Sequence, residues 1–388
     1  MKKNISLAKK SLAYHKKLNG KIGVFSKAPL KSMEDLKLSY TPGVGAVSSY
    51  LALHKDQAKK YTIKKNAVAV VSDGSAVLGL GNIGVEGALP VMEGKAVIFK
   101  EFANIDAFPI VLDTQNVDEI VKTIKHIAPV FGAINLEDIS APRCFEIEKR
   151  LQGMLDIFVM HDDQHATAIV VLAGLINAFK VVKKDLKASS IVVIGAGSAG
   201  TAVTKLLYAY GIKNIIVVDI KGILSRCRGN MLVHQKNLAD ITNKNCKEGT
   251  LKDALVGVDA VVGLSAPNII KPEFIKTMNE KPIVFALANP YPEIMPDMAK
   301  KAGAFIIATG RSDFKNQVNN ALVFPGIFRG ALDYNIKKIT NEIEINAAKK
   351  LAGIIKNPTP DKIIPSIFDS KVVKAVSSSM KNKKSNAT

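Results

Sequence analysis

Residues 191–200 read Ile-Val-Val-Ile-Gly-Ala-Gly-Ser-Ala-Gly, and this stretch decides the fold. Four apolar residues of strand type lead directly into a GxGxxG pattern, and a helical segment, residues 201–210, follows. In this setting Gly195 permits a tight turn, Gly197 lets a pyrophosphate approach the backbone, and Gly200 allows close helix–strand packing. The helix N-terminus adds N–H donors for phosphate. The stretch therefore predicts a dinucleotide-binding loop, and glycines used only for tight packing are the alternative.

An acidic residue, Asp219, follows the next apolar run at residues 215–218. At this place a carboxylate can accept a hydrogen bond from a ribose hydroxyl. Three further apolar runs come later, separated by helical segments: 260–264, 283–287 and 305–308. Such alternation predicts a parallel, doubly wound sheet. The residues expected to contact the cofactor are Gly195, Ala196, Gly197, Ser198, Ala199, Gly200 and Asp219.

Composition bounds the class of protein. The 388 residues are 47% hydrophobic and 23% charged, which allows a sizeable core and excludes disorder. The formal charge is +20, but only six residues are Arg and Trp is absent, so a nucleic-acid partner is not favoured. Three sparse cysteines are typical of a reducing compartment, and the longest apolar run, 166–179, is too short to span a bilayer. We therefore expect a cytoplasmic protein with no nucleic-acid or membrane partner.

The first half of the chain is typical of a small α/β unit. Short apolar runs of strand type occur at residues 67–72, 96–99, 110–112 and 155–160. The last of these runs ends in His161, and a helix over 166–179 follows. We predict an α/β fold with an N-terminal domain over 1–163 and a C-terminal Rossmann domain, with C-terminal helices, over 164–388. The last residues, 381–388, are expected to form a frayed tail.

A second GxGxxG pattern occupies residues 79–84 and also follows a strand-like run. No acidic residue closes a plausible second strand at the right offset, and Glu101 is the nearest candidate. Close approach of the backbone to a substrate or to a neighbouring strand is therefore favoured here over a second dinucleotide site.

Two pairs of acids, Glu137-Asp138 and Asp162-Asp163, can supply oxygen ligands. The second pair follows an apolar strand at its carboxyl end, where sites form in α/β sheets. Neighbouring side chains on a strand point to opposite faces, so the first pair reaches one ion only where the chain bends, such as before Pro142. Four carboxylates favour Mg²⁺ or Mn²⁺. The alternative is solvated acids, one of them capping the next helix, and spacing alone does not decide.

Four other polar side chains or pairs stand in positions suited to chemistry. Lys95 begins an apolar run and, if partly desolvated, can act as a base, although the chain has many lysines. Tyr40 can donate a proton, but packing against a following helix is the default interpretation. Asn289 follows an expected strand, and Asn319 and Asn320 offer amides for a small carboxylate. Turn and cap roles for these asparagines are equally consistent with the spacing.

Taken together, the motifs resemble those of the short, bacterial-type malic enzymes. The resemblance extends from about residue 11 to about residue 375, and no single motif decides it. The matching segments, in the family's order, are 39–44, 73–84, 92–95, 134–139, 161–167, 195–200, 288–290 and 319–326.

This resemblance implies oxidative decarboxylation of (S)-malate to pyruvate and CO₂ with reduction of NAD(P)⁺, in a homodimer or larger homo-oligomer. It places Lys95 at the general base, which takes the proton of the malate C2 hydroxyl. It places Tyr40 at the general acid, which protonates C3 of enolpyruvate. A neutral lysine is needed first, so we expect burial and a nearby cation to lower the pKa of Lys95.

The resemblance also implies a metal site and a substrate site. Glu137, Asp138 and Asp163 fall at ligands of Mg²⁺ or Mn²⁺, and Asp162 falls at a neighbour that supports the lysine. The residues implied to hold malate or pyruvate are Lys95, Asn289, Asn319 and Asn320.

Two positions depart from the family pattern. Ala166 replaces the usual glycine of the motif at 161–167, which could tighten the turn beside the metal. The segment Asp219-Ile-Lys-Gly222 replaces a more usual Asp-Ser-Lys-Gly. Asp219 favours the free ribose hydroxyl of NAD, Lys221 could meet the phosphate of NADP, and the balance leans to NAD. A non-decarboxylating two-domain dehydrogenase and a non-catalytic, Lys-rich binding protein remain alternatives.

Overall fold

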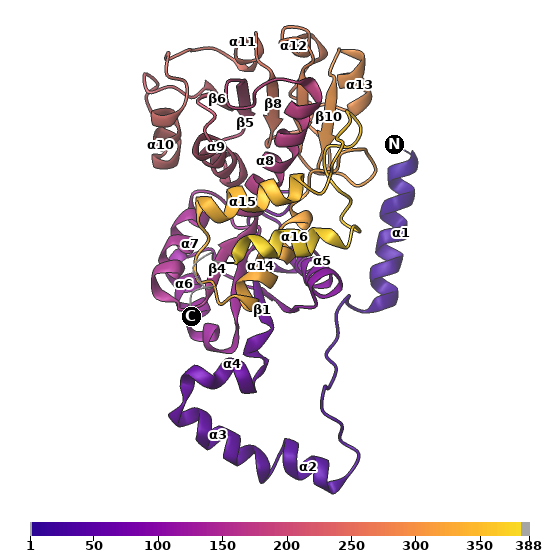
Figure 1. Ribbon diagram of the computed structural model, residues 1–388, viewed down its shortest axis with the longest axis vertical. Helices are drawn as coiled ribbons and strands as arrows, with labels where there is room; N and C mark the ends of the chain where they lie inside the picture. The colour runs from indigo at the N-terminus through magenta and orange to yellow at the C-terminus, as the bar shows by residue number, and fades with distance from the viewer. Residues whose placement is uncertain (1, 382–388) are drawn as a thin grey trace.

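The computed structural model describes residues 2–381 and contains two sheets flanked by helices (Figure 1). The first sheet has the order β2-β1-β3-β4 and is parallel, with strands β1 Ala67–Ser72, β2 Asp106–Val111, β3 Ala133–Leu136 and β4 Phe158–His161. The second has the order β10-β9-β8-β5-β6-β7, with strands β5 Ser190–Ile194, β6 Asn214–Asp219, β7 Gly222–Ile223, β8 Ala260–Gly263, β9 Ile283–Ala286 and β10 Ile306–Thr309. Only the short β7 is antiparallel to its neighbour. The predicted α/β class is confirmed.

Three groups of helices surround these sheets. Those of the first half are α1 Lys2–Leu18, α2 Met33–Ser39, α3 Gly43–Leu53, α4 Ala58–Tyr61, α5 Gly84–Ala103, α6 Val117–Ile127 and α7 Arg143–Met154. Those of the middle are α8 Asp162–Val182, α9 Ser198–Tyr210, α10 Val233–Ile241, α11 Leu251–Leu255, α12 Pro272–Ile275 and α13 Pro296–Lys301. The last three are α14 Phe324–Asp333, α15 Asn341–Ala352 and α16 Lys371–Ser377.

Helix α8 is the long apolar helix expected at 166–179, and it begins four residues earlier, at Asp162. Within residues 2–381 it is the one helix long and apolar enough to cross a membrane, but 72% of its most apolar window is buried. Its buried amide, Asn177, donates to the carbonyls of Ala352 and Ile363 at 2.9 Å each. These contacts are those of a core helix, which the sequence predicted.

The expected strand at residues 96–99 is wrong, because these residues lie inside α5. Met92, Ala96 and Phe99 are spaced four and three residues apart, so a helix turns them to one side, where all three are buried. A run of four apolar residues does not reveal this period by itself. The missing strand position is taken by β2, which begins at Asp106 rather than at residue 110.

The C-terminal helices return to the first sheet (Figure 1). The ring of Phe99 on α5 lies 4.7 Å from that of Phe324 and 5.2 Å from that of Phe328, both on α14. Phe328 also meets Phe158 of β4 at 5.3 Å. The end of the chain therefore completes the core of its beginning, and the boundary at 163/164 stays a prediction. Most of the tail expected at 381–388 lies outside the described residues.

Residues 28–61, here called the N-terminal arm, extend away from the body of the molecule (Figure 1). They include α2, α3 and α4, and every residue of the arm is partly or fully exposed. Leu53 is 82% exposed and Met33 is 69% exposed, although large apolar side chains are usually buried. The arm therefore presents an apolar surface that its own chain does not cover.

Candidate active site

A cavity of about 290 Å³ lies between the first sheet and the second. Its walls come from the loops after β1 and β3, from α5 and α8, and from the glycine loop and the loops after β9 and β10. Sites of α/β proteins form at such strand ends. The residues predicted from the sequence that line it are Lys95, Glu137, Asp138, Asp163, Ser198, Ala199, Asn289, Asn319 and Asn320.

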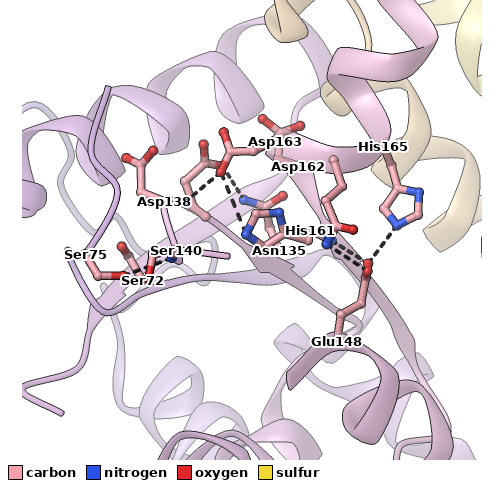
Figure 2. Close-up of polar contacts among 12 residues, drawn as sticks. Ser72, Ser75, Asn135, Asp138, Ser140, Glu148, His161, Asp162, Asp163 and His165 are labelled. Atoms are coloured by element: carbon pink, nitrogen blue, oxygen red, sulfur yellow. Dashed lines mark hydrogen bonds and ion pairs between the residues drawn. The ribbon is translucent and has the colours of Figure 1, made fainter. Parts of the chain in front are cut away.

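Two neighbouring strands bring the four acids together. Glu137 and Asp138 follow β3, Asp162 and Asp163 follow β4, and the parallel pairing places both pairs at one edge of the sheet. The chain bends at Asp138, whose φ of 54° is left-handed, rather than before Pro142. The backbone N–H of Asp138 donates to Asp163 at 3.0 Å (Figure 2).

Three of these acids fit a divalent cation. Oxygen atoms of Glu137, Asp138 and Asp163 all lie within 4.8 Å of one another. Oδ2 of Asp138 is buried and has no hydrogen-bond partner among the described residues. Burial, together with the charge of Asp163, raises the pKa of Asp138 to about 8. An ion with oxygen ligands, such as Mg²⁺ or Mn²⁺, would satisfy these atoms and offset their charges.

Lys95 lies inside α5 and is buried beside the same acids. Its Nζ is 2.9 Å from Oε1 of Glu137 and also contacts Asp162. Burial alone would lower the pKa of Lys95, but the charges of Asp162, Glu137 and Asp163 together raise it above its usual value. The expected lowering is therefore not found in the metal-free arrangement, because the carboxylates outweigh the burial.

The asparagines differ in their contacts. Asn320 donates to Asp162 at 2.6 Å, so Asp162 holds both this amide and the amine of Lys95. Asn319 uses its side chain locally, accepting from the N–H of Ala321 and donating to the carbonyl of Gly310. Asn320 is thereby the amide tied to the lysine, whereas Asn319 shapes the loop.

A buried network that the sequence did not reveal holds the start of α8. Glu148 of α7 accepts from the backbone N–H of His161 at 2.8 Å and lies 2.9 Å from His165 (Figure 2). His165 also lies 2.7 Å from Glu344 of α15. Burial alone would lower the pKa of His165, but the two glutamates raise it well above its usual value. The paired histidines at 161 and 165 were the only signal of it.

The glycine loop has the shape that a dinucleotide requires. Gly195 has a φ of 106°, and a Cβ on Gly200 would lie 1.9 Å from the carbonyl oxygen of Gly195. A Cβ on Gly197 would meet nothing within 4 Å, so its backbone is open to a ligand. In the second pattern, a Cβ on Gly79 would lie 1.9 Å from the carbonyl oxygen of Asn289, which is the close backbone approach favoured by the sequence.

Asp219 ends β6 as predicted, but its partner was missed. Arg228 donates to both oxygens of its carboxylate, at 2.9 and 2.5 Å. Burial alone would raise the pKa of Asp219, but hydrogen bonds from Arg228 and from the backbone of Lys221 keep it below its usual value. Arg228 follows nine residues after the acid, a spacing that no pattern in the sequence marked.

Tyr40 does not join the cavity of its own chain. It lies on the N-terminal arm and is 66% exposed. Within residues 2–381, the side chains that line the cavity include no Tyr, His or Cys. Ala166, the departure from the family's glycine, is buried inside α8, where alanine is the residue that best favours a helix.

Comparisons with known proteins agree with this arrangement. Residues 19–152 match the malic enzyme N-terminal domain, and residues 165–381 match the malic enzyme NAD binding domain. The NAD-dependent malic enzyme of Geobacillus stearothermophilus is 53% identical over 92% of this chain and 75% of its own. The bifunctional malic/malolactic enzyme of Bacillus subtilis is 48% identical over 96% of this chain and 92% of its own.

A solved structure agrees as well, and other relatives are named NADP-dependent malic enzymes. The crystal structure of the NAD-dependent malic enzyme from Thermotoga maritima is similar with a TM-score of 0.92 and 48% identity, covering 96% of this chain and 98% of that chain. The resemblance noted in the sequence is confirmed: the chain belongs to the malic enzyme family, NAD(P)-dependent oxidoreductases that oxidatively decarboxylate malate.

Proposed function

We propose that the cavity converts (S)-malate to pyruvate and CO₂ by proton transfers at Lys95 and Tyr40 and by hydride transfer to a nicotinamide. The observation that carries this proposal is the position of Lys95, buried between Glu137 and Asp162 in a cavity that also meets the glycine loop. A lysine that faces both a group of acids and a dinucleotide loop is suited to oxidation of a hydroxyl.

The proposed sequence begins with the proton of the malate C2 hydroxyl, which passes to neutral Lys95 as the C2 hydride leaves for NAD(P)⁺. Asp162 and Asn320 hold the lysine and the substrate in register. The C4 carboxylate then departs as CO₂, and Tyr40 protonates C3 of the resulting enolpyruvate. A bound Mg²⁺ or Mn²⁺ would supply Lewis acidity toward the substrate oxygens and offset the charges of the acids around it.

A malate assay tests the reaction. We expect NAD(P)H, pyruvate and CO₂ to form in equal amounts when malate, cofactor and Mn²⁺ are present, and chelation of the metal to abolish turnover. Accumulation of oxaloacetate without CO₂ would instead support a dehydrogenase that does not decarboxylate. Salt-sensitive binding to DNA without any malate-dependent NAD(P)H would support the non-catalytic binding protein.

We propose NAD as the preferred cofactor. The carboxylate at the end of β6, Asp219, repels a phosphate on the adenosine ribose more than a hydroxyl. The measurement is kcat/KM for NAD against NADP in the same assay, and a higher value for NADP would overturn the preference.

We propose a cytoplasmic homodimer in which the N-terminal arm of each copy covers a second copy. The arm exposes Leu38, Tyr40 and Leu53 at 69%, 66% and 82%, and exposed apolar surface of this extent marks a protein contact. A second copy is the occupant that fits, because a two-fold dimer buries both arms at once and leaves none uncovered. Sedimentation of the full chain as a monomer at micromolar concentration would contradict it.

The dimer also accounts for the proposed general acid. Among the described residues the cavity wall has no tyrosine, histidine or cysteine, yet carbon protonation needs a donor other than the base. Tyr40, exposed on the arm, is free to enter the cavity of a partner copy. We infer that each site combines Lys95 of one subunit with Tyr40 of the other.

A further inference from the structure

We propose that Arg228 selects between the two nicotinamide cofactors and that Asp219 sets this selection by pairing with it. The inference rests on the proposed function only in that the glycine loop, residues 195–200, binds a dinucleotide. NAD and NADP differ by one phosphate on the adenosine ribose. Selectivity therefore depends on which charges and hydrogen-bonding groups meet the 2′ position of that ribose.

The ion pair stands beside the glycine loop. Strand β6 pairs with β5 in parallel, and the N–H of Gly195 donates to the carbonyl of Val218 at 2.8 Å, so Asp219 lies next to the start of the loop. Helix α10 is fastened to the same loop, because Nε2 of His234 lies 3.0 Å from the carbonyl oxygen of Ala196. The pair is thus at the place where the adenosine ribose of a bound dinucleotide lies.

The carboxylate of Asp219 is already fully engaged. Its Oδ1 accepts from the backbone N–H of Lys221 at 2.8 Å and from Nη1 of Arg228 at 2.9 Å. Its Oδ2 accepts from Nη2 of Arg228 at 2.5 Å and from the amide of Gln235 at 3.2 Å. A carboxylate has about four acceptor positions, so these four donors occupy them. The main task of Asp219 in this structure is to hold Arg228.

Arg228, in contrast, has donors to spare. A guanidinium has five N–H groups, and its Nε is buried without a hydrogen-bond partner in the described part of the chain. The side chain is 19% exposed, so it is held in place rather than free in solvent. A fixed guanidinium with an unused N–H has the chemistry that binds a phosphate oxygen.

The charge of the pair then decides the ligand. While Asp219 is ionised, it cancels the charge of Arg228, and a 2′-phosphate would approach a carboxylate as closely as a guanidinium. A ribose hydroxyl carries no charge and does not suffer this repulsion. Removing the negative charge of Asp219 leaves an unpaired cation at the 2′ position, and NADP gains a partner that NAD does not use.

Nucleotide binding without malate tests this inference on the full chain. Calorimetry measures the affinities for 5′-AMP and for adenosine 2′,5′-bisphosphate, which differ only by the 2′-phosphate. We expect Asp219→Asn to raise the affinity ratio in favour of the bisphosphate by about 10- to 100-fold, the value of one hydrogen bond to a charged group. The double variant Asp219→Asn, Arg228→Met should lose this gain. The matched control Asp219→Asn, Arg226→Met should keep it, because Arg226 is exposed in the same loop.

Three results would overturn the inference: an unchanged ratio in Asp219→Asn, a gain that survives Arg228→Met, or a gain that Arg226→Met abolishes equally. Far-ultraviolet circular dichroism checks that each variant is folded, and Asp219→Ser serves in the same measurement if Asp219→Asn is not. Since neither nucleotide takes part in turnover, a protein that fails the malate assay can still pass this test, and the two failures are distinguishable.

Discussion

The wall of the cavity around Lys95 and the N-terminal arm around Tyr40 carry the two proposed proton-transfer groups, and they are built in opposite ways. Lys95 is 9% exposed and held by Glu137 and Asp162, inside a helix packed on the first sheet. Tyr40 is 66% exposed on a segment without a core of its own. The chain alone positions its base, whereas positioning its acid requires a second copy.

The largest effect is expected at the buried side of this comparison. Lys95→Met removes the proposed base and leaves Glu137 and Asp162 buried without their cation, so turnover should fall by roughly 10²- to 10⁴-fold. Initial rates of NAD(P)H formation measure it. Lys100→Met is the matched control on the same helix, because Lys100 is half-exposed and pairs with Asp106 away from the cavity. Near-normal rates in Lys95→Met would remove the lysine from the mechanism.

The next effect concerns the arm. Tyr40→Phe should slow pyruvate formation by about 10²-fold or more while largely sparing the reduction of oxaloacetate, because only protonation of carbon needs the phenol. Pyruvate release and oxaloacetate reduction, measured separately, give this contrast. Tyr61→Phe is the control, since Tyr61 is also exposed on the arm.

Mixed dimers decide whether the two regions meet across the subunit interface. When Lys95→Met and Tyr40→Phe chains exchange subunits freely, half of the dimers carry one site with both groups intact, so activity should return to about a quarter of wild type. If each site drew both groups from one chain, no mixed dimer would contain an intact site. Activity that stays at the level of the separate variants would therefore refute the crossed arrangement.

A smaller effect is expected for a single metal ligand. Asp163→Asn removes one of the three facing carboxylates, and the apparent affinity for Mn²⁺ should fall by about 10- to 100-fold. Titration of activity with Mn²⁺ measures this, with the exposed Asp113→Asn as control. An unchanged titration would count against ligation by Asp163.

The smallest effect is a pH dependence of the same titration. The pKa of Asp138 is raised to about 8, so below that pH the metal-free side chain binds a proton that Mn²⁺ must displace. Affinity for Mn²⁺ should thus increase with pH, by up to about tenfold per unit, and level off above pH 8. A flat profile between pH 6 and pH 8 would mean that the carboxyl does not compete with the metal.

The sequence predicted the second sheet well, because each of its strands is a buried apolar run next to a helix, and its glycine loop lies at a defined place. It failed at residues 96–99, where apolar residues are buried by helical period rather than by strand pairing. The acids could be named, but their convergence depends on the left-handed bend at Asp138, which neighbouring residues do not announce. Arg228 and Glu148 were missed because their partners lie on other elements.

The return of α14 to the first sheet has a consequence for synthesis on the ribosome. Phe324 and Phe328 pack against Phe99 and Phe158, so these two early aromatic rings stay uncovered until more than three hundred residues have been translated. Domains commonly fold as they emerge, from the N-terminal end. Here the first domain cannot close its core in that order, and the nascent chain must keep an apolar face soluble until its last helices arrive.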